Sequence, residues 1–136
     1  MIRSDAFPLK TCVGALLVSQ QRILLTHHRA DRESYPNVGD IPGGHVDTGE
    51  TEVEALVREL REEIGIEITT LSNVPFCVID DDGFRMIVWN VTSWTGTPVN
   101  KATGEHDDLR WVTFDELQSL HLAHPSYHDL SLSVLA

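Results

Sequence analysis

The 136-residue chain is poor in cysteine and in positive charge, and it has no long hydrophobic run. Its two cysteines, Cys12 and Cys77, are too few for a disulfide framework. Both stand in apolar segments, which predicts buried free thiols in a reducing compartment. No segment approaches the roughly 18 apolar residues of a membrane helix, and the polar N-terminal residues contain no signal-peptide core. We therefore expect a cytoplasmic protein with no membrane partner.

The shortage of basic residues sets the charge of the protein. Ten Lys and Arg residues stand against 21 Asp and Glu residues, so the formal net charge is −11 at pH 7. This charge repels nucleic-acid backbones, which makes a nucleic-acid polymer an unfavourable partner. The same repulsion acts on any phosphate ligand. Phosphate chemistry on this chain therefore calls for a metal ion between the carboxylates and the ligand.

Length and composition predict a single domain over residues 1–136. Hydrophobic residues make up 41% of the chain and charged residues 23%, which is typical of globular proteins and unlike disordered ones. A chain of this length buries one hydrophobic core but has no room for two. We expect one site on one scaffold.

The hydrophobic pattern predicts a mixed α/β protein. Five runs rich in Val, Leu and Ile are expected to be strands: 12–19, 22–26, 66–79, 84–94 and 109–112. Three segments with helical spacing or capping signals are expected to be helices: 50–64, 114–120 and 125–135. Loops are expected over 29–49 and 95–108, and a hairpin turn over 80–83. Because strands stand before, between and after the helices, we expect a mixed sheet with helices on both faces.

Three carboxylates in the 50–64 helix carry the clearest chemical signal. Glu59, Glu62 and Glu63 stand at i, i+3 and i+4, so they share a helix face. That face is expected beside the apolar stripe, which consists of Val53, Leu56, Val57, Leu60 and Ile64. Arginine compensates the charge only partly, since Arg58 can reach Glu62 at i+4 whereas Arg61 points further round. The remaining charge favours a hard cation such as Mg²⁺ or Mn²⁺. A solvated helix with surface ion pairs is the common alternative.

The sequence around these carboxylates favours the metal interpretation. Residues 44–66 read GHVDTGETEVEALVRELREEIGI and follow Pro42-Gly43. This segment resembles, without a missing position, the Nudix box Gly-x5-Glu-x7-Arg-Glu-U-x-Glu-Glu-x-Gly-U, in which U is apolar. The Arg110-Trp111-Val112 stretch before Phe114 is also similar to that family. The resemblance therefore extends beyond the box to the whole chain.

Resemblance to the MutT-like Nudix hydrolases implies a fold and a reaction. The implied fold is an α/β/α sandwich with a mixed β-sheet and a loop-helix-loop catalytic motif. The implied reaction is Mg²⁺-dependent hydrolysis of a pyrophosphate bond, with Mn²⁺ as an alternative cofactor. The substrate would be a nucleoside triphosphate or a nucleoside diphosphate linked to another group.

The same resemblance implies the roles of individual residues. The implied metal ligands are the carbonyl group of Gly43 and the side chains of Glu59, Glu62, Glu63 and Glu105. Glu105 comes from the second loop, where family members often place an extra carboxylate. Glu50 and Arg58 are implied to pair and hold the loop against the helix, as groups behind metal ligands commonly do. Glu62, Glu63 and Glu105 all remain candidates for the general base.

The substrate itself is less visible in the sequence. A short chain with little beyond the box is similar to MutT-type enzymes, which favours a (d)NTP, including an oxidised one, as a small-molecule partner. ADP-ribose or another nucleotide sugar is an alternative, and so are a non-catalytic nucleotide-binding module and a protein-binding domain. Gly39 stands where many family members have Trp, so different loop packing is expected. A monomer and a homodimer both remain open.

Some aromatic residues and histidines are further candidates. Four aromatic residues could stack on a nucleobase, although strand aromatics more often belong to the core: Phe7, Phe84, Trp89 and Trp94. Three histidines near the C-terminus have helix-like spacing: His121, His124 and His128. Because Pro125 interrupts that spacing, we expect an exposed tail there rather than a second metal site.

Overall fold

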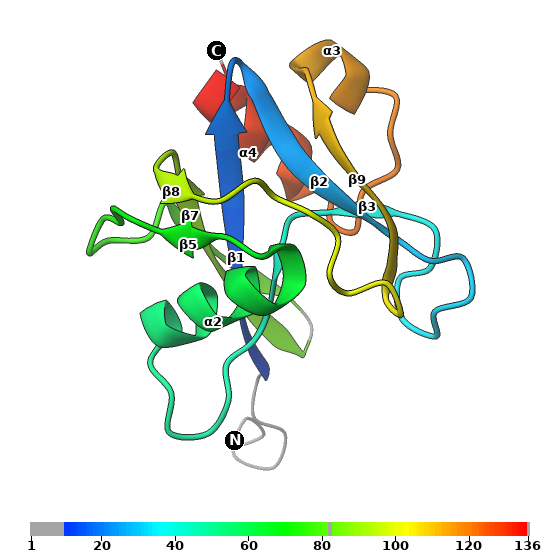
Figure 1. Cartoon of the computed structure of the whole chain (residues 1–136). Coiled ribbons are helices and arrows are strands. Elements are labelled where there is room, and N and C mark those ends of the chain that lie inside the picture. Colours follow the sequence, from blue (N-terminus) through cyan, green and yellow to red (C-terminus); the bar gives the residue numbers. More distant parts are fainter. Residues whose placement is uncertain (1–9, 82, 136) are drawn as a thin grey trace.

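The computed structural model describes residues 10–81 and 83–135, which form a mixed α/β fold (Figure 1). The strands are β1 (Lys10–Ser19), β2 (Arg22–His28), β3 (Gly39–Asp40), β4 (Gly43–His45), β5 (Glu67–Ile68), β6 (Cys77–Asp81), β7 (Phe84–Val91), β8 (Trp94–Thr95) and β9 (His106–Val112). The helices are α2 (Glu52–Ile64), α3 (Phe114–Leu117) and α4 (Ser126–Leu135). Within the described residues, no helix combines the length and apolar character needed to span a bilayer. Phe7 lies outside the described residues.

Strand β1 organises the main sheet. It pairs in parallel with β7, and it pairs antiparallel with β4 near its start and with β2 at its end. Strand β6 extends the sheet beyond β7, while β3 and β9 both pair with β2. Strands β5 and β8 form a separate two-stranded sheet. The predicted mixed sheet is confirmed.

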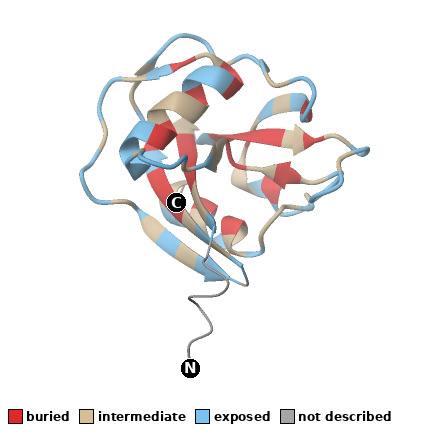
Figure 2. Ribbon diagram, turned by 90° about the horizontal axis from the view of Figure 1, so that it is seen from below, coloured by how far each residue is buried: buried red, intermediate tan, exposed pale blue. Residues whose placement is uncertain are grey.

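The side chains of β1 alternate between two hydrophobic cores, as the two-residue period of a strand requires. Val13 and Leu17 lie in the core beneath α2, whereas Leu16 lies in the core beneath α3 and α4. Figure 1 shows α2 in front of the sheet and α4 behind it. Figure 2 shows buried residues on the inner sides of these elements. The predicted α/β/α sandwich, with helices on both faces of the sheet, is confirmed.

Local capping signals set both ends of α2. The Thr51 side chain accepts a hydrogen bond from the Glu54 amide, and the Glu54 carboxylate accepts one from the Thr51 amide, which completes a capping box. Gly65 ends the helix in the left-handed conformation with φ of 73°. The helix therefore begins two residues later than expected. Glu50 is left outside it, where its carboxylate can meet the side chain of Arg58.

Several predicted strand boundaries were wrong. The expected strand 66–79 is split into β5 and β6, and the segment between them contains Pro75, which lacks the amide needed for continuous pairing. The expected strand 84–94 ends at Val91, since Trp94 pairs with Ile68 in the small sheet instead. Strand β6 also continues through Asp80 and Asp81, two residues of the predicted turn.

The two expected loops are also shorter than predicted. The 29–49 segment contains β3 and β4, which are held by pairing with β2 and β1. Strand β9 begins at His106 rather than at Leu109, because its pairing with β2 extends that far. Helix α3 ends at Leu117, three residues before the predicted end. Both cysteines are free, but they are partly exposed rather than buried.

Candidate active site

Strand β4 and helix α2 bring the Pro-Gly-Gly segment against the box glutamates. The Gly43 amide donates a hydrogen bond to Oε1 of Glu63 at 3.1 Å. A Cβ atom on Gly43 would lie 2.0 Å from the Val13 carbonyl oxygen, and one on Gly44 would lie 2.3 Å from Cδ of Glu59. Gly43 is therefore required by the close approach of its backbone to β1, whereas a side chain at Gly44 would displace the Glu59 carboxylate.

Arg58 joins the loop to the helix. Its Nε donates to Oε2 of Glu50 at 2.6 Å, and its Nη2 donates to Oε1 of Glu50 and to the His45 carbonyl, both at 3.0 Å. Oε1 of Glu50 also accepts a hydrogen bond from the Asp47 amide. These contacts, first among them the Arg58 guanidinium, lower the pKa of Glu50 to about 2. The two-pronged geometry orients both side chains as well as binding them.

The same guanidinium also contacts two of the three box glutamates. Nη1 of Arg58 lies 2.8 Å from Oε1 of Glu59 and 3.3 Å from Oε1 of Glu62. In both contacts the glutamate uses Oε1, and Oε2 is not involved. Arg58 thus compensates more of the negative charge than the i, i+4 spacing alone predicted.

The three glutamates do not lie equally beside the apolar stripe, and that prediction was wrong. The side chain of Glu62 is 59% exposed and that of Glu59 is 19% exposed, whereas that of Glu63 is only 9% exposed. Glu63 belongs to the buried face of α2. Val53, assigned to the stripe from its spacing, is 40% exposed instead. The reason is that the Glu63 side of α2 packs against β4, where Oε1 of Glu63 accepts the Gly43 amide.

The carboxylate of Glu63 has the most perturbed ionisation at the site. Burial raises the pKa of Glu63 to about 9, and the nearby charges of Glu59, Asp40 and Glu105 act in the same direction. Its Oε2 lies 3.8 Å from Nε2 of His106. Burial lowers the pKa of His106, so this imidazole is neutral at pH 7.

The site has the donor chemistry that suits a divalent cation. Carboxylate and carbonyl oxygens are the ligands that Mg²⁺ prefers, and a cation beside Glu63 would favour its ionised form. Within residues 10–81 and 83–135, no three His, Cys, Asp or Glu side chains converge closely enough to enclose a metal ion. Arg58 contacts only Oε1 of Glu59 and of Glu62, so Oε2 of each is available to a cation, and joint coordination requires the side chains to move closer together.

Glu105 approaches this site from the loop before β9. Its side chain is exposed, and its negative charge raises the pKa of both Glu59 and Glu63. The backbone of the same loop contacts α2 through the Lys101 amide, which donates to the Glu63 carbonyl at 2.9 Å. The structure therefore brings Glu105 towards the box helix, although 42 positions separate it from Glu63 in the sequence.

A buried polar cluster behind the site was missed in the sequence. His28, only 4% exposed, donates through Nδ1 to the Tyr35 carbonyl, and its Nε2 lies 2.9 Å from Oδ2 of Asp40. The His28 ring is 5.4 Å from that of His106. The alternation of Leu24, Thr26 and His28 along β2 could have placed His28 on an inner face.

The remaining aromatic and histidine candidates lie elsewhere. Trp89 is buried in the core, and Trp94 stacks on Trp111 with 6.0 Å between ring centroids. The Phe84 ring meets His124 edge-on, and Nε2 of His124 lies 3.0 Å from Oδ2 of Asp81. The face of Trp94 is therefore occupied by Trp111, and the Trp89 ring is enclosed in the core, so neither ring is placed beside the box glutamates to stack on a nucleobase.

Gly39 allows a distinct packing of the loop before the box. The Gly39 amide donates to the His121 carbonyl, and the Ala123 amide donates to the Gly39 carbonyl. Cδ2 of Leu122 would lie 3.0 Å from a Cβ at Gly39. The segment before α4 thus fills the space that a larger side chain would need.

The Arg58–Glu50 contact predicts a stability effect. Arg58→Lys keeps the charge but loses the planar fork, and we expect it to lower Tm by roughly 3–6 °C. Arg61→Lys is the matched control, because Arg61 pairs with Glu67 at the surface and exposed pairs contribute little. Thermal unfolding of both variants measures the difference. Equal values for the two would contradict the proposed importance of the fork.

Comparison with known proteins identifies the family of this chain. A family model described as NUDIX domain matches residues 8–132. The chain is 31% identical to nucleoside triphosphatase NudI of Klebsiella pneumoniae over 93% of this chain and 97% of that protein. It is 33% identical to the 8-oxo-dGTP diphosphatase of Escherichia coli over 68% of this chain and 73% of that protein.

The solved structures show the same relationship. A MutT NUDIX hydrolase from Burkholderia pseudomallei superposes with a TM-score of 0.80 at 26% identity, covering 93% of this chain and 98% of that one. The protein belongs to the Nudix hydrolase family. As a member of this family of pyrophosphohydrolases, it is an enzyme that acts on phosphoanhydride bonds.

Proposed function

We propose that this enzyme hydrolyses a nucleoside triphosphate, including an oxidised one, with Mg²⁺ as its cofactor and Mn²⁺ as a substitute. Glu59, Glu62, Glu63, Glu105 and the Gly43 carbonyl would hold the ion. The observation that carries the proposal is the buried Glu63 carboxylate, which accepts a hydrogen bond from the Gly43 amide. Among the described residues, no Lys or Arg forms an ion pair with it. The names of both reported relatives, a nucleoside triphosphatase and an 8-oxo-dGTP diphosphatase, support the substrate class.

The exposure of each side chain indicates its role in the proposed reaction. When bound, Mg²⁺ would screen the phosphate charge and favour in-line attack by water. Glu62 and Glu105 face solvent, so one of these two carboxylates would accept the proton of the attacking water. Glu63 is less suited to that role because its Oε1 already accepts the Gly43 amide. Arg58 and Glu50 would keep the loop in register with α2.

A small nucleotide is a better partner for this surface than a polymer. The formal charge of −11 opposes binding of an extended phosphate backbone, whereas a single metal-bound polyphosphate presents little charge to the rest of the surface. A cytoplasmic location would supply such nucleotides together with Mg²⁺.

A nucleotide screen tests the function directly. The protein is incubated with Mg²⁺ and with canonical and oxidised (d)NTPs, ADP-ribose, other nucleotide sugars and 5′-triphosphorylated RNA, and the products are identified. We expect a nucleoside triphosphate to give the highest kcat/KM, and Glu62→Gln to lower turnover at least roughly tenfold. Faster cleavage of a nucleotide sugar or of RNA would change the substrate class. Unchanged turnover in folded Glu62→Gln would remove Glu62 from the site.

A further inference from the structure

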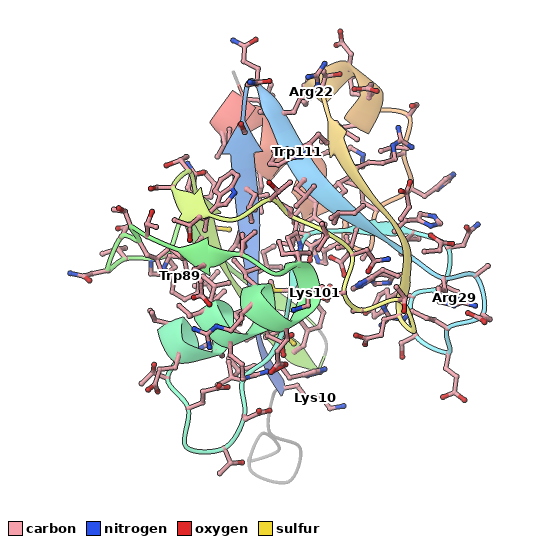
Figure 3. The ribbon with its side chains drawn as sticks, in the orientation of Figure 1. Lys10, Arg22, Arg29, Trp89, Lys101 and Trp111 are labelled. Carbon is pink, nitrogen blue, oxygen red and sulfur yellow. The ribbon has the colours of Figure 1, made fainter. Side chains whose placement is uncertain are left out.

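Arg32 is an arginine without an ion pair in the described part of the chain. In residues 10–81 and 83–135, four other arginines each pair with a carboxylate: Arg29, Arg58, Arg61 and Arg85. Arg22 and Arg110 also form no such pair, but both act on the pKa of Glu116 at α3. Figure 3 shows Arg22 at that end of the molecule, far from α2. Among these three unpaired arginines, only Arg32 belongs to the 29–38 loop, whose backbone contacts that of Glu105.

Contacts between two loops join the backbone of the Arg32 loop to the loop that carries Glu105. The 29–38 loop, which follows β2, meets the loop before β9 through the Arg29 amide and the Glu105 carbonyl, 3.0 Å apart. At the same junction, Nδ1 of His27 lies 2.7 Å from Oδ1 of Asp107. Glu105, the candidate ligand, thus also binds the loop that contains Arg32 through its backbone carbonyl.

Hydrogen bonds within the 29–38 loop also connect its backbone. The Arg32 amide donates to the Arg29 carbonyl at 3.2 Å, and the Asn37 amide donates to the same carbonyl at 3.4 Å. The buried His28 ring binds the Tyr35 carbonyl at 2.7 Å. The loop therefore presents Arg32 as a half-buried side chain on a fixed backbone.

The electrostatic neighbourhood agrees with this placement. The positive charge of Arg32 contributes to lowering the pKa of His106, whose Nε2 is 3.8 Å from Glu63. The charges of Asp40 and Glu105 act on both His106 and Glu63. Arg32, Asp40 and Glu105 thus all lie within electrostatic range of His106.

We propose that Arg32 binds a phosphate group of the substrate's polyphosphate chain and so favours triphosphates over substrates with fewer phosphates. A guanidinium matches phosphate oxygens in a two-pronged geometry, and an unpaired one keeps all its donors available. In a protein with 21 acidic residues, a cation at this position offsets repulsion of the anionic ligand. This inference rests on the proposed function.

Binding of inorganic tripolyphosphate tests the inference without requiring turnover. Calorimetric titrations in Mg²⁺ compare wild type, Arg32→Ala, Arg32→Lys and Arg29→Ala. Arg29→Ala is the matched control, since it removes an equal charge from the same loop but from a guanidinium already paired with Asp31. We expect Kd to rise roughly 10- to 100-fold in Arg32→Ala, to rise less in Arg32→Lys, and to change less than about twofold in Arg29→Ala.

Kinetics then separates this inference from the proposed function. With the preferred triphosphate, Arg32→Ala should raise KM by a similar factor and leave kcat within about threefold, as expected for lost ground-state binding. Equal tripolyphosphate affinity of wild type and Arg32→Ala would overturn the role of Arg32, and so would equal weakening in Arg29→Ala. If wild type bound tripolyphosphate through Arg32 but cleaved no nucleotide, the proposed function would fail and the phosphate site would stand.

Discussion

Glu63→Gln should make the metal-free protein more stable at pH 8 and at the same time remove its Mg²⁺-dependent activity. The pKa of Glu63 is about 9 in the folded, metal-free protein, against an ordinary value of 4.5 for the unfolded chain. The folded state therefore holds this proton more tightly than the unfolded state. The resulting contribution to the free energy of unfolding is fully present below about pH 4.5, and it is lost as the pH rises towards 9.

Glutamine keeps the hydrogen-bond acceptor for the Gly43 amide but cannot ionise. We expect Tm of the metal-free variant to exceed that of wild type by roughly 5–10 °C at pH 8 and to match it near pH 4.5. Added Mg²⁺ should stabilise wild type more than the variant. Because a buried carboxylate ligand is lost, kcat/KM should fall by at least roughly 100-fold.

Thermal unfolding with a chelator at both pH values measures this effect. Glu62→Gln is the matched control, because its side chain is 59% exposed and its Tm should change by less than about 2 °C. A Glu63→Gln variant no more stable than wild type at pH 8 would show that the carboxylate is well solvated in the folded protein.

Gly44→Ala should give a folded protein with little activity. The new methyl group would lie 2.3 Å from Cδ of Glu59 and 2.4 Å from its Oε2, so the carboxylate has to move. The end of a glutamate side chain moves easily, and we therefore expect Tm to change by only a few degrees. Displacing the Glu59 carboxylate removes its contact with Arg58 and its position facing the loop. A loss of at least roughly 100-fold in kcat/KM follows, since small displacements in active sites have effects of this size.

Gly104→Ala is the control for the added methyl group. No atom lies within 4 Å of a Cβ at Gly104, so activity and Tm should stay close to the wild-type values. Steady-state kinetics and thermal unfolding measure kcat/KM and Tm of the two variants. Full activity in Gly44→Ala would mean that the position of Glu59 beside the loop does not matter for the reaction.

The local signals of the sequence were the reliable ones. The periodicity of α2, its Thr51 and Gly65 caps and the spacing of Glu59, Glu62 and Glu63 all lie within one short segment, so their geometry follows from the helix itself. The strand boundaries were less predictable. The split of segment 66–79 depends on pairing between Ile68 and Trp94, which is not visible in either strand alone.

The sequence by itself therefore determined the α/β class, the complete Nudix box and the three glutamates on one helix, since these depend on contacts between near neighbours in the chain. Only the tertiary structure decided that Glu63 is buried, and that the loops carrying Arg32 and Glu105 meet. Burial follows from the way α2 packs on β4, and the loops meet because β2 pairs with β9. The His27–Asp107 contact at that junction joins residues 80 positions apart, a separation over which sequence spacing carries no geometric information.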